Sequence, residues 1–187
     1  ESGAYHIFFR TDVDDRMVES DESNNMMSVP FVFHATPADL VPLTDQVPRV
    51  MTGPPNPTVT LIWGVTNQGI GPAVHDQFWL DRVYLSTNAV WDGTASWWAD
   101  GSEMGPIPAG DGYWHTNTVR LPVVASGTYH LFFQADAGNA VIESDESNNL
   151  VAVPFTFDST PPDLAPISFQ GPSVVTAPPN PAVTLVW

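Results

Sequence analysis

The chain has no cysteine among its 187 residues, which excludes disulfide bonds and thiolate metal sites. Lysine is missing too, and five arginines stand against 21 acidic residues, giving a formal net charge of -16. A protein that binds the phosphate backbone of nucleic acids needs clustered positive charge, which this sequence lacks. We therefore expect no nucleic-acid partner.

Long apolar runs are also lacking, because no stretch approaches the roughly 18 residues that a bilayer-spanning helix needs. We therefore expect no direct membrane span. The composition is still 43% hydrophobic, which is enough for a packed core. Because 19 prolines and 13 glycines divide this apolar material, we expect it to form many short segments.

One acidic segment occurs twice in the chain. MVESDESNN (17–25) and VIESDESNN (141–149) differ only in their first two letters. At this offset of 124 residues, position 17 against 141, more than half of residues 1–63 recur identically at 125–187. The sequence therefore contains a repeat with a domain-sized period.

The repeated unit has the pattern of short β-strands. Val59, Leu61, Trp63 and Val65 recur with a period of two, and runs rich in aromatic and β-branched residues follow at 75–86, 112–124 and 129–136. Glycine- and asparagine-containing turn signals separate these runs, including a turn expected at 137–139, and no segment has a helical period. About seven strands per unit predict an all-β fold of antiparallel, immunoglobulin-like β-sandwiches in tandem.

The repeat also predicts where the domains begin and end. ADLVPL follows Pro37, and PDLAPI follows a proline at the equivalent position. We predict that 1–37 are the last two strands of a preceding repeat, 38–160 one complete sandwich and 161–187 the first two strands of a following repeat. Because neither flank has an equivalent of residues 64–124, we expect further sequence on both sides.

Four motifs in order make the unit similar to a known family. They are ADLVPL (38–43), VTNQG (65–69), DRVYLS (81–86) and GTYHLFFQADAGNAVIESDESNN (127–149). The unit resembles the CARDB repeat, a bacterial immunoglobulin-like module associated with cell adhesion. The resemblance implies a non-catalytic, multi-copy structural protein that is extracellular or on a cell surface. A tryptophan-rich insertion, WDGTASWWADG (91–101), departs from the family pattern and is expected to form a loop.

The acidic segments concentrate oxygen donors near the end of a hairpin. Calcium takes six to eight oxygen ligands, and a set of Asp, Glu and Asn without His or Cys suits Ca²⁺ better than zinc. We predict Ca²⁺ binding by two sets of side chains, one at Asp136, Glu143, Asp145, Glu146, Asn148 and Asn149, the other at Asp12, Glu19, Asp21, Glu22, Asn24 and Asn25. Asp145 is expected to point to solvent, given the alternation of side chains. The alternative is turn chemistry without a bound ion, because Asp and Asn side chains bond to nearby backbone groups.

Aromatic side chains gather around the insertion and form a second candidate site. The residues are Trp91, Trp97, Trp98 and Trp114. Three interpretations stay open: packing within the domain, contact with another protein or repeat, and stacking on a glycan. A carbohydrate-binding surface module is therefore the alternative to a purely structural role.

The remaining patterns argue against catalysis. No Gly-x-Ser-x-Gly, phosphate-binding loop or His-Glu-x-x-His motif occurs. The seams TPADL and TPPDL are short and stiffened by proline. We therefore expect no enzyme but a structural and adhesive repeat protein, a semi-rigid rod or filament stiffened by calcium. Its expected partners are neighbouring repeats or identical chains, and cell-surface glycans or proteins.

Overall fold

The computed structural model describes residues 2–186, apart from the side chain of residue 45, and its regular structure is almost entirely β-strand. Within this range the only helical element is η1 (Glu22–Asn24), a single 3-10 turn. The strands are β1 (Gly3–Arg10), β2 (Met26–Phe33), β3 (Leu40–Gln46), β4 (Val50–Gly53), β5 (Thr58–Asn67), β6 (Trp79–Ser86), β7 (Ser96–Glu103), β8 (Gly112–Arg120), β9 (Gly127–Gln134) and β10 (Leu150–Ser159). The all-β prediction is confirmed. No helix in the described part of the chain is long and apolar enough to cross a membrane.

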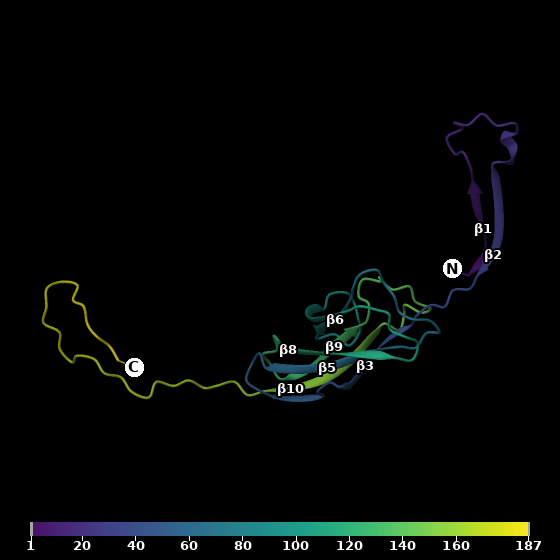
Figure 1. Ribbon diagram of the computed structural model, residues 1–187. Helices are drawn as coiled ribbons and strands as arrows, with labels where there is room; N and C mark the ends of the chain where they lie inside the picture. Colours follow the sequence, from purple (N-terminus) through teal and green to yellow (C-terminus); the bar gives the residue numbers. More distant parts are fainter. Residues whose placement is uncertain (1, 187) are drawn as a thin grey trace.

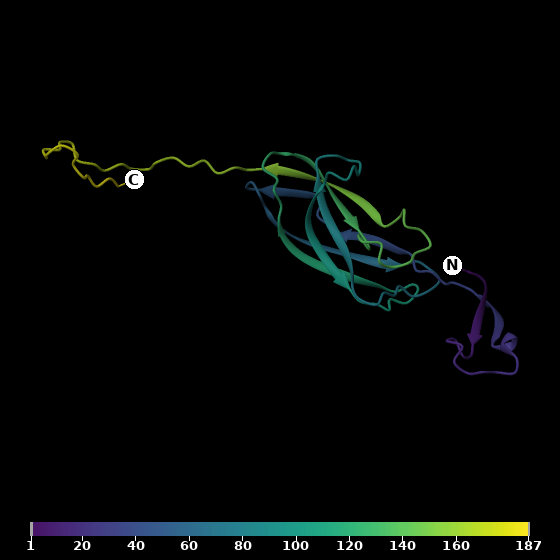
Figure 2. The ribbon, with the colours of Figure 1, turned by 90° about the horizontal axis from the view of Figure 1, so that it is seen from above.

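The body of the molecule is a sandwich of two sheets (Figures 1 and 2). One sheet has the strand order β4-β10-β9-β6-β7 and the other the order β3-β5-β8. Neighbouring strands are antiparallel, except that β4 and β10 run parallel. The body thus has eight strands, where the sequence predicts about seven.

The additional strand corrects one expectation. Residues 91–101 were expected to form an inserted loop, but β7 begins within that segment and pairs with β6 from Trp79↔Glu103 to Leu85↔Ser96. Its sequence, SWWADGSE, is too polar to signal a buried strand. As an edge strand, β7 has only one neighbour and tolerates such a composition.

Alternating residues of β5 supply the centre of the core. Leu61, Trp63 and Val65 are completely buried, as the period of two predicts. They face Leu131 and Phe133 of β9, and the rings of Trp63 and Phe133 lie 5.5 Å apart between centroids. The two sheets are therefore held together by one continuous apolar layer.

The chain enters the sandwich at one end and leaves it at the other. β3 begins beside the connection between β9 and β10, where residues 38 and 143 form a bridge. β10 runs from that end through the sheet and finishes at Ser159, and the hairpin β1–β2 and the C-terminal segment lie beyond opposite ends of the body (Figure 1).

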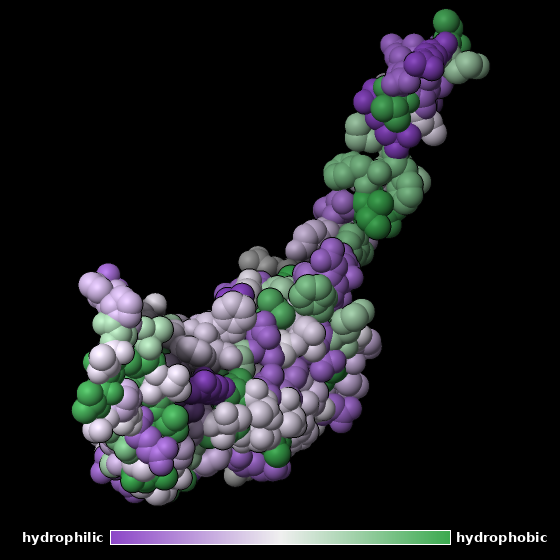
Figure 3. All heavy atoms as spheres, turned by 90° about the vertical axis from the view of Figure 1, so that its left-hand side faces the viewer, coloured by the Kyte–Doolittle hydropathy of each residue, from purple (hydrophilic) through white to green (hydrophobic). Residues whose placement is uncertain are grey.

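The first hairpin, β1–β2, reproduces the pairing of β9–β10 outside any sandwich. Gly3 pairs with Phe33 just as Gly127 pairs with Phe157, at the same offset of 124 residues. Its apolar side chains are uncovered: Phe9 is 54% exposed, whereas Phe133, its counterpart, is completely buried. Figure 3 shows hydrophobic side chains between the hydrophilic tip of this hairpin and the body.

The segment after Ser159 forms no strand within the described residues. It is exposed, and its one bridge, Gln170↔Val186, repeats the pairing Gln46↔Ile62 between β3 and β5. Two strands are predicted for 161–187, and the structure shows only this single bridge of their expected pairing.

Candidate functional site

The second acidic segment lies in the connection between β9 and β10, at the end where the chain enters the sandwich. We call residues 135–149 the acidic corner. Asp136, near its start, is completely buried, with a backbone φ of 37°. Asn139 N donates to Asp136 O at 2.9 Å, which closes the turn that the sequence predicts at 137–139.

Asp136 is fixed in place by backbone and side-chain bonds. Its Oδ2 accepts a hydrogen bond from Val141 N at 2.7 Å, and its own N–H donates to Asp81 Oδ1 at 2.8 Å. Its second oxygen, Oδ1, is buried and has no hydrogen-bond partner among the described residues. A buried carboxylate oxygen without a donor is unusual and calls for a ligand or ordered solvent.

Glu143 joins the acidic corner to the strand that enters the domain. Its Oε2 accepts a hydrogen bond from Leu40 N, and its Oε1 accepts one from Asn149 Nδ2 at 2.9 Å. Burial, together with the nearby charges of Glu146 and Asp136, raises the pKa of Glu143 to about 7, although the two hydrogen bonds act in the opposite direction.

Further bonds tie the same corner to residues 38 and 39. Ser144 N donates to Ala38 O at 2.8 Å, and Asn148 Nδ2 donates to Asp39 Oδ1 at 2.8 Å. The acidic corner therefore concentrates carboxylates and also holds the first residues of the domain by hydrogen bonds. We call this set of hydrogen bonds to residues 38–40 the clasp.

The other predicted ligands of the corner divide into inward and outward groups. Asn149 is buried, and its Nδ2 also reaches Glu146 Oε2 at 3.3 Å. The side-chain oxygens of Asn148 and Asn149 are buried without a partner among the described residues. Asp145 is exposed and accepts bonds from the N–H and hydroxyl of Ser147, as expected for a residue facing solvent.

The first acidic segment lies at the tip of the β1–β2 hairpin and is exposed. Asp12 Oδ2 accepts from Met17 N at 2.8 Å, and Glu22 Oε1 accepts from Glu19 N at 3.0 Å. A polar hollow in this tip is lined by Asp12, Glu22 and Asn25, among others. Asp21 accepts from Ser23, and Asn24 ends the 3-10 turn.

These oxygens are not gathered into a compact carboxylate cluster. Within residues 2–186, no three acidic or histidine side chains lie close enough together to form a metal site. The three unpartnered buried oxygens, from Asp136, Asn148 and Asn149, belong to one carboxylate and two amides. All three are oxygen atoms, the kind of ligand that an alkaline-earth cation prefers.

Comparison with family models decides the affiliation of the chain, because the CARDB model matches residues 37–153. The chain belongs to the CARDB family. This confirms the resemblance drawn from the four motifs and points to an adhesion-related domain of a family that is typically extracellular or on cell surfaces.

One solved structure supports the fold of this CARDB domain, and two others are similar to parts of it. The crystal structure of the CARDB domain of a Pyrococcus furiosus protein, in complex with di-metal ions, has a TM-score of 0.50 and 22% identity, covering 68% of this chain and 100% of that chain. The solution structure of the same domain has a TM-score of 0.48 and 20% identity, covering 66% and 98%. A β-glucosidase from Listeria innocua in complex with glucose has a TM-score of 0.43 and 11% identity, covering 66% of this chain and 16% of that chain. The comparison with curated proteins gives no match.

The four candidate tryptophans, Trp91, Trp97, Trp98 and Trp114, do not form one patch in the CARDB domain. Trp91 packs on the outer face of the larger sheet, with its ring centroid 4.8 Å from that of Tyr84 and 5.3 Å from that of Phe132. Trp97 lies on β7 under the guanidinium of Arg82, which is 5.2 Å from the ring centroid.

The remaining two tryptophans lie apart from that contact. Trp98 follows on β7 and is partly exposed. Trp114 belongs to β8 in the other sheet, where Tyr113 and His115 turn inward and leave it facing out. The structure thus separates Trp114 from the tryptophans of the insertion.

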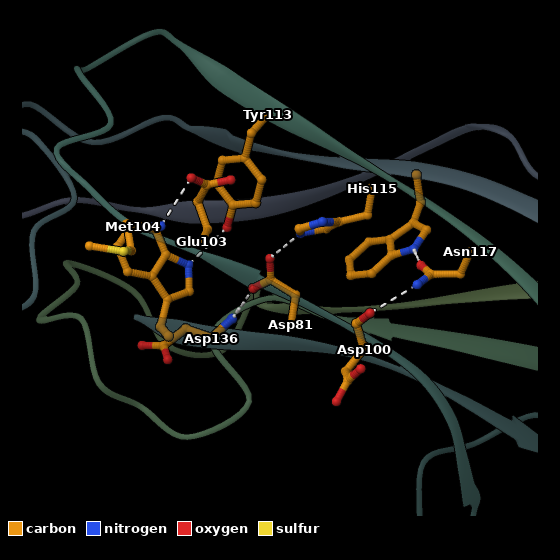
Figure 4. Close-up of polar contacts among 10 residues, drawn as sticks. Asp81, Asp100, Glu103, Met104, Tyr113, His115, Asn117 and Asp136 are labelled. Carbon is orange, nitrogen blue, oxygen red and sulfur yellow. Dashed lines mark hydrogen bonds and ion pairs between the residues drawn. The ribbon is translucent and has the colours of Figure 1, made fainter. Parts of the chain in front are cut away.

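A buried polar network behind the acidic corner was missed by the sequence analysis. Asp81 on β6 is completely buried; its Oδ1 accepts the Asp136 N–H, and its Oδ2 lies 2.9 Å from His115 Nε2 on β8 (Figure 4). Burial and the Asp81 charge raise the pKa of Tyr113, whose hydroxyl accepts from Trp79 Nε1 at 2.9 Å. The one available signal was an aspartate within the apolar run WLDRVYLS, at a position whose alternation points inward.

Gly101 makes room for this network. A Cβ at residue 101 would lie 2.4 Å from the ring of His115, so only glycine allows the ring to pass between the sheets. The ring thereby reaches Asp81 and links the two sheets through a polar contact. Because Asp81 also holds the backbone of Asp136, the network positions the acidic corner.

Proposed function

We propose that this chain is a non-catalytic structural segment of an extracellular adhesive protein, in which CARDB domains follow one another in a rod stiffened by calcium. The observation that carries the proposal is the β1–β2 hairpin. It has the register of β9–β10 and leaves uncovered the side chains that are buried in the complete sandwich. Such a hairpin needs the rest of a sandwich to bury these side chains.

The path of the chain also supports a linear array. Because it enters the sandwich at the acidic corner and leaves at the opposite end, each added domain extends the row (Figure 1). The excess of acidic residues keeps such a surface soluble and disfavours anionic partners.

The acidic corner supplies the calcium part of the proposal. Asp136 presents a buried oxygen with no protein donor, and Glu143, Glu146, Asn148 and Asn149 lie in the same connection. The crystal structure of the similar Pyrococcus furiosus CARDB domain is in complex with di-metal ions, which supports a metal in this family. In the first copy the equivalent residues are Asp12, Glu19, Glu22, Asn24 and Asn25. Asp145 is left out because it faces solvent in the complete sandwich, and Asp21 is left out as its counterpart.

A bound Ca²⁺ would supply positive charge to an acidic corner that already clasps the first residues of the domain. Binding to the folded state alone stabilises it by about 2.7 kcal/mol when free calcium is a hundredfold above Kd. Extracellular modules bind calcium with Kd on the order of 10⁻⁴ to 10⁻³ M, so that millimolar calcium fills such sites.

Thermal unfolding with and without calcium tests this proposal. We expect Ca²⁺ to raise the Tm of the full chain relative to EDTA, and we expect Glu143→Ala combined with Asn149→Ala to abolish the increase. Asp145→Asn is the matched control, because it removes a carboxylate from the same segment but one that faces solvent. An equal Tm in calcium and EDTA, together with no heat of calcium binding in calorimetry, would contradict the calcium part and leave the structural part standing.

One observation favours a second candidate function, binding of a glycan by β7. Trp97 is 54% exposed and its ring is held in place by Arg82, which leaves a rigid aromatic surface. Trp91 does not contribute, because it packs against Tyr84 and Phe132. Binding of the chain to a glycan array that is lost in Trp97→Ala and kept in Trp114→Ala would support it; no binding would leave Trp97 as packing or protein contact.

A further inference from the structure

The exit end of the sandwich holds the chain up to residue 160. Ser159 N donates to Ser126 Oγ at 2.9 Å, and Ser159 Oγ donates to Val124 O at 2.9 Å. Thr160 N then donates to Gly53 O at 2.8 Å. The chain is therefore bound to its own domain through Thr160.

The entering end holds the chain from residue 36 onward. Pro37 O accepts hydrogen bonds from Ile70 N at 3.2 Å and from Gly71 N at 3.1 Å. A Cβ on Gly71 would lie 1.8 Å from Thr36 O, so the two backbones touch at this point. The residues after Pro37 are held by the acidic corner, as described above.

Thr36 and Thr160 are the same position in successive copies. The first hairpin keeps the exit bond of the complete domain, because Ala35 N donates to Ser2 Oγ at 2.8 Å as Ser159 N does to Ser126 Oγ. In a series of copies, the threonine that ends the contacts of one domain thus begins the contacts of the next. No residue between two domains is left as a free linker.

Because no linker residue separates two domains, the exit face of one domain lies next to the entering face of the following domain. The entering face exposes Val74 (55%) and Ile142 (84%), which line a cavity with Pro72 and with the end of the first hairpin at Phe33. In a complete copy the counterpart of Phe33 is buried in its own core. Another part of the preceding domain must therefore cover this apolar face.

The exit face offers a matching surface. Val124, 60% exposed, and Pro54 flank the point where the chain leaves the sandwich, because Val124 O and Gly53 O hold Ser159 and Thr160. Arg120 lies at the same end, with its Nε bonded to Asn56 O. The entering face carries the carboxylates of the acidic corner, so Arg120 adds a charge of opposite sign to the match between apolar side chains.

We propose that the entering face of each CARDB domain, formed by Pro72, Val74 and Ile142, docks on the exit face of the preceding copy of the same domain, formed by Pro54 and Val124. The junction is then a fixed interface and not a hinge. This inference rests on the proposed function, because it requires a preceding copy. It goes further in naming the partner and the two surfaces.

The test uses the full chain with one added copy, in which residues 37–160 are repeated directly after Thr160. Because the chain has no cysteine, Thr87→Cys in each copy places two spin labels at defined, exposed sites. Pulsed electron resonance then gives the distribution of distances between the labels. A control carries five Gly and Ser residues at the junction, which add about 12 Å of r.m.s. end-to-end freedom.

We expect one narrow distance peak for the two-copy chain and a broad distribution for the control with the inserted linker. Val74→Ser with Ile142→Ser in the second copy should broaden the peak toward that control. Trp97→Ser should leave the peak narrow, since Trp97 is as exposed as Val74 but lies on the sheet face.

Three results would overturn the inference, and they differ in what they leave intact. A broad distribution from two copies that each unfold cooperatively rules out a fixed junction but keeps the array. A distance peak that stays equally narrow in the variant with Val74→Ser and Ile142→Ser rules out these docking surfaces. An added copy that does not fold contradicts the proposed tandem arrangement itself.

Discussion

The acidic connections at 11–25 and 135–149 share several hydrogen bonds to their own neighbours but differ in their bonds to the rest of the chain. Asp12 and Asp136 share a φ of 38° and 37°, and each accepts a bond from the backbone five residues later. Asp21 and Asp145 each accept from the serine two residues on. These contacts depend only on nearby sequence.

The long-range contacts separate the two segments. Glu143 accepts from Leu40 N and Asn149, and burial raises its pKa. Its counterpart Glu19 is exposed, and the N–H of Glu19 donates to Glu22 in the same tip. The comparison shows that nearby residues determine the turn. The burial of Glu143, its hydrogen bond to Leu40 N and its raised pKa require the surrounding sandwich.

The largest effect is expected from Asp81→Ala, which removes the support of the second segment only. It leaves His115 and the Asp136 N–H without their buried acceptor, which costs about 3 kcal/mol or more. Urea unfolding followed by tryptophan fluorescence measures the loss. A loss below about 1 kcal/mol would mean that the network does not position the corner.

A smaller change in the free energy of unfolding should distinguish Glu143 from Glu19, the glutamate at the same position of the first copy. Glu143→Ala should lower the free energy of unfolding of the sandwich by about 1–2 kcal/mol, because Leu40 N loses its acceptor at the clasp. Glu19→Ala should not change that transition, since its side chain belongs to the exposed tip. Equal effects of the two variants would show that the clasp contributes nothing.

The pH dependence of stability should come from the second segment as well. The pKa of Glu143 is raised from 4.5 to about 7, so the folded state holds a proton that the unfolded state has lost. Its contribution to stability is therefore complete below pH 4.5 and is lost as the pH rises through about 7. Because Glu143 is half-exposed, solvent screening makes the loss shallower than an isolated buried group would give.

Unfolding in EDTA across this pH range measures the effect. The Tm of the wild-type chain should fall as the pH rises, and Glu143→Gln should flatten the curve because it cannot ionise. Glu19→Gln is the control and should follow the wild type. A curve that stays sloped in Glu143→Gln would assign the proton to another group.

The sequence predicted the parts of this comparison that local pattern determines. The period of two in β5, the turn at 137–139 and the exposure of Asp145 are all properties of adjacent residues. The family followed from motifs in order, because each motif marks a strand or turn that the fold repeats.

The parts that were missed depend on residues far apart in the chain. Asp81 and His115 lie in different sheets, and the sequence around either residue does not predict their contact. The strand β7 is polar and is formed by pairing with β6, so the insertion was expected to be a loop. The scattering of Trp91, Trp97 and Trp114 over two sheets likewise follows from topology alone.

The smallest expected effect is a lowered pKa that Asp21 and Asp145 share. Hydrogen bonds from Ser23 hold the pKa of Asp21 below its ordinary value, and bonds from Ser147 do the same for Asp145. An NMR titration should therefore show both aspartates with lowered pKa values, and Ser23→Ala or Ser147→Ala should return the local one toward the ordinary value. Because these bonds are local and exposed, completing or removing the surrounding sandwich should leave both titrations unchanged. If Asp145 alone had a lowered pKa, the turn would depend on the domain, and the division between local and long-range contacts would fail.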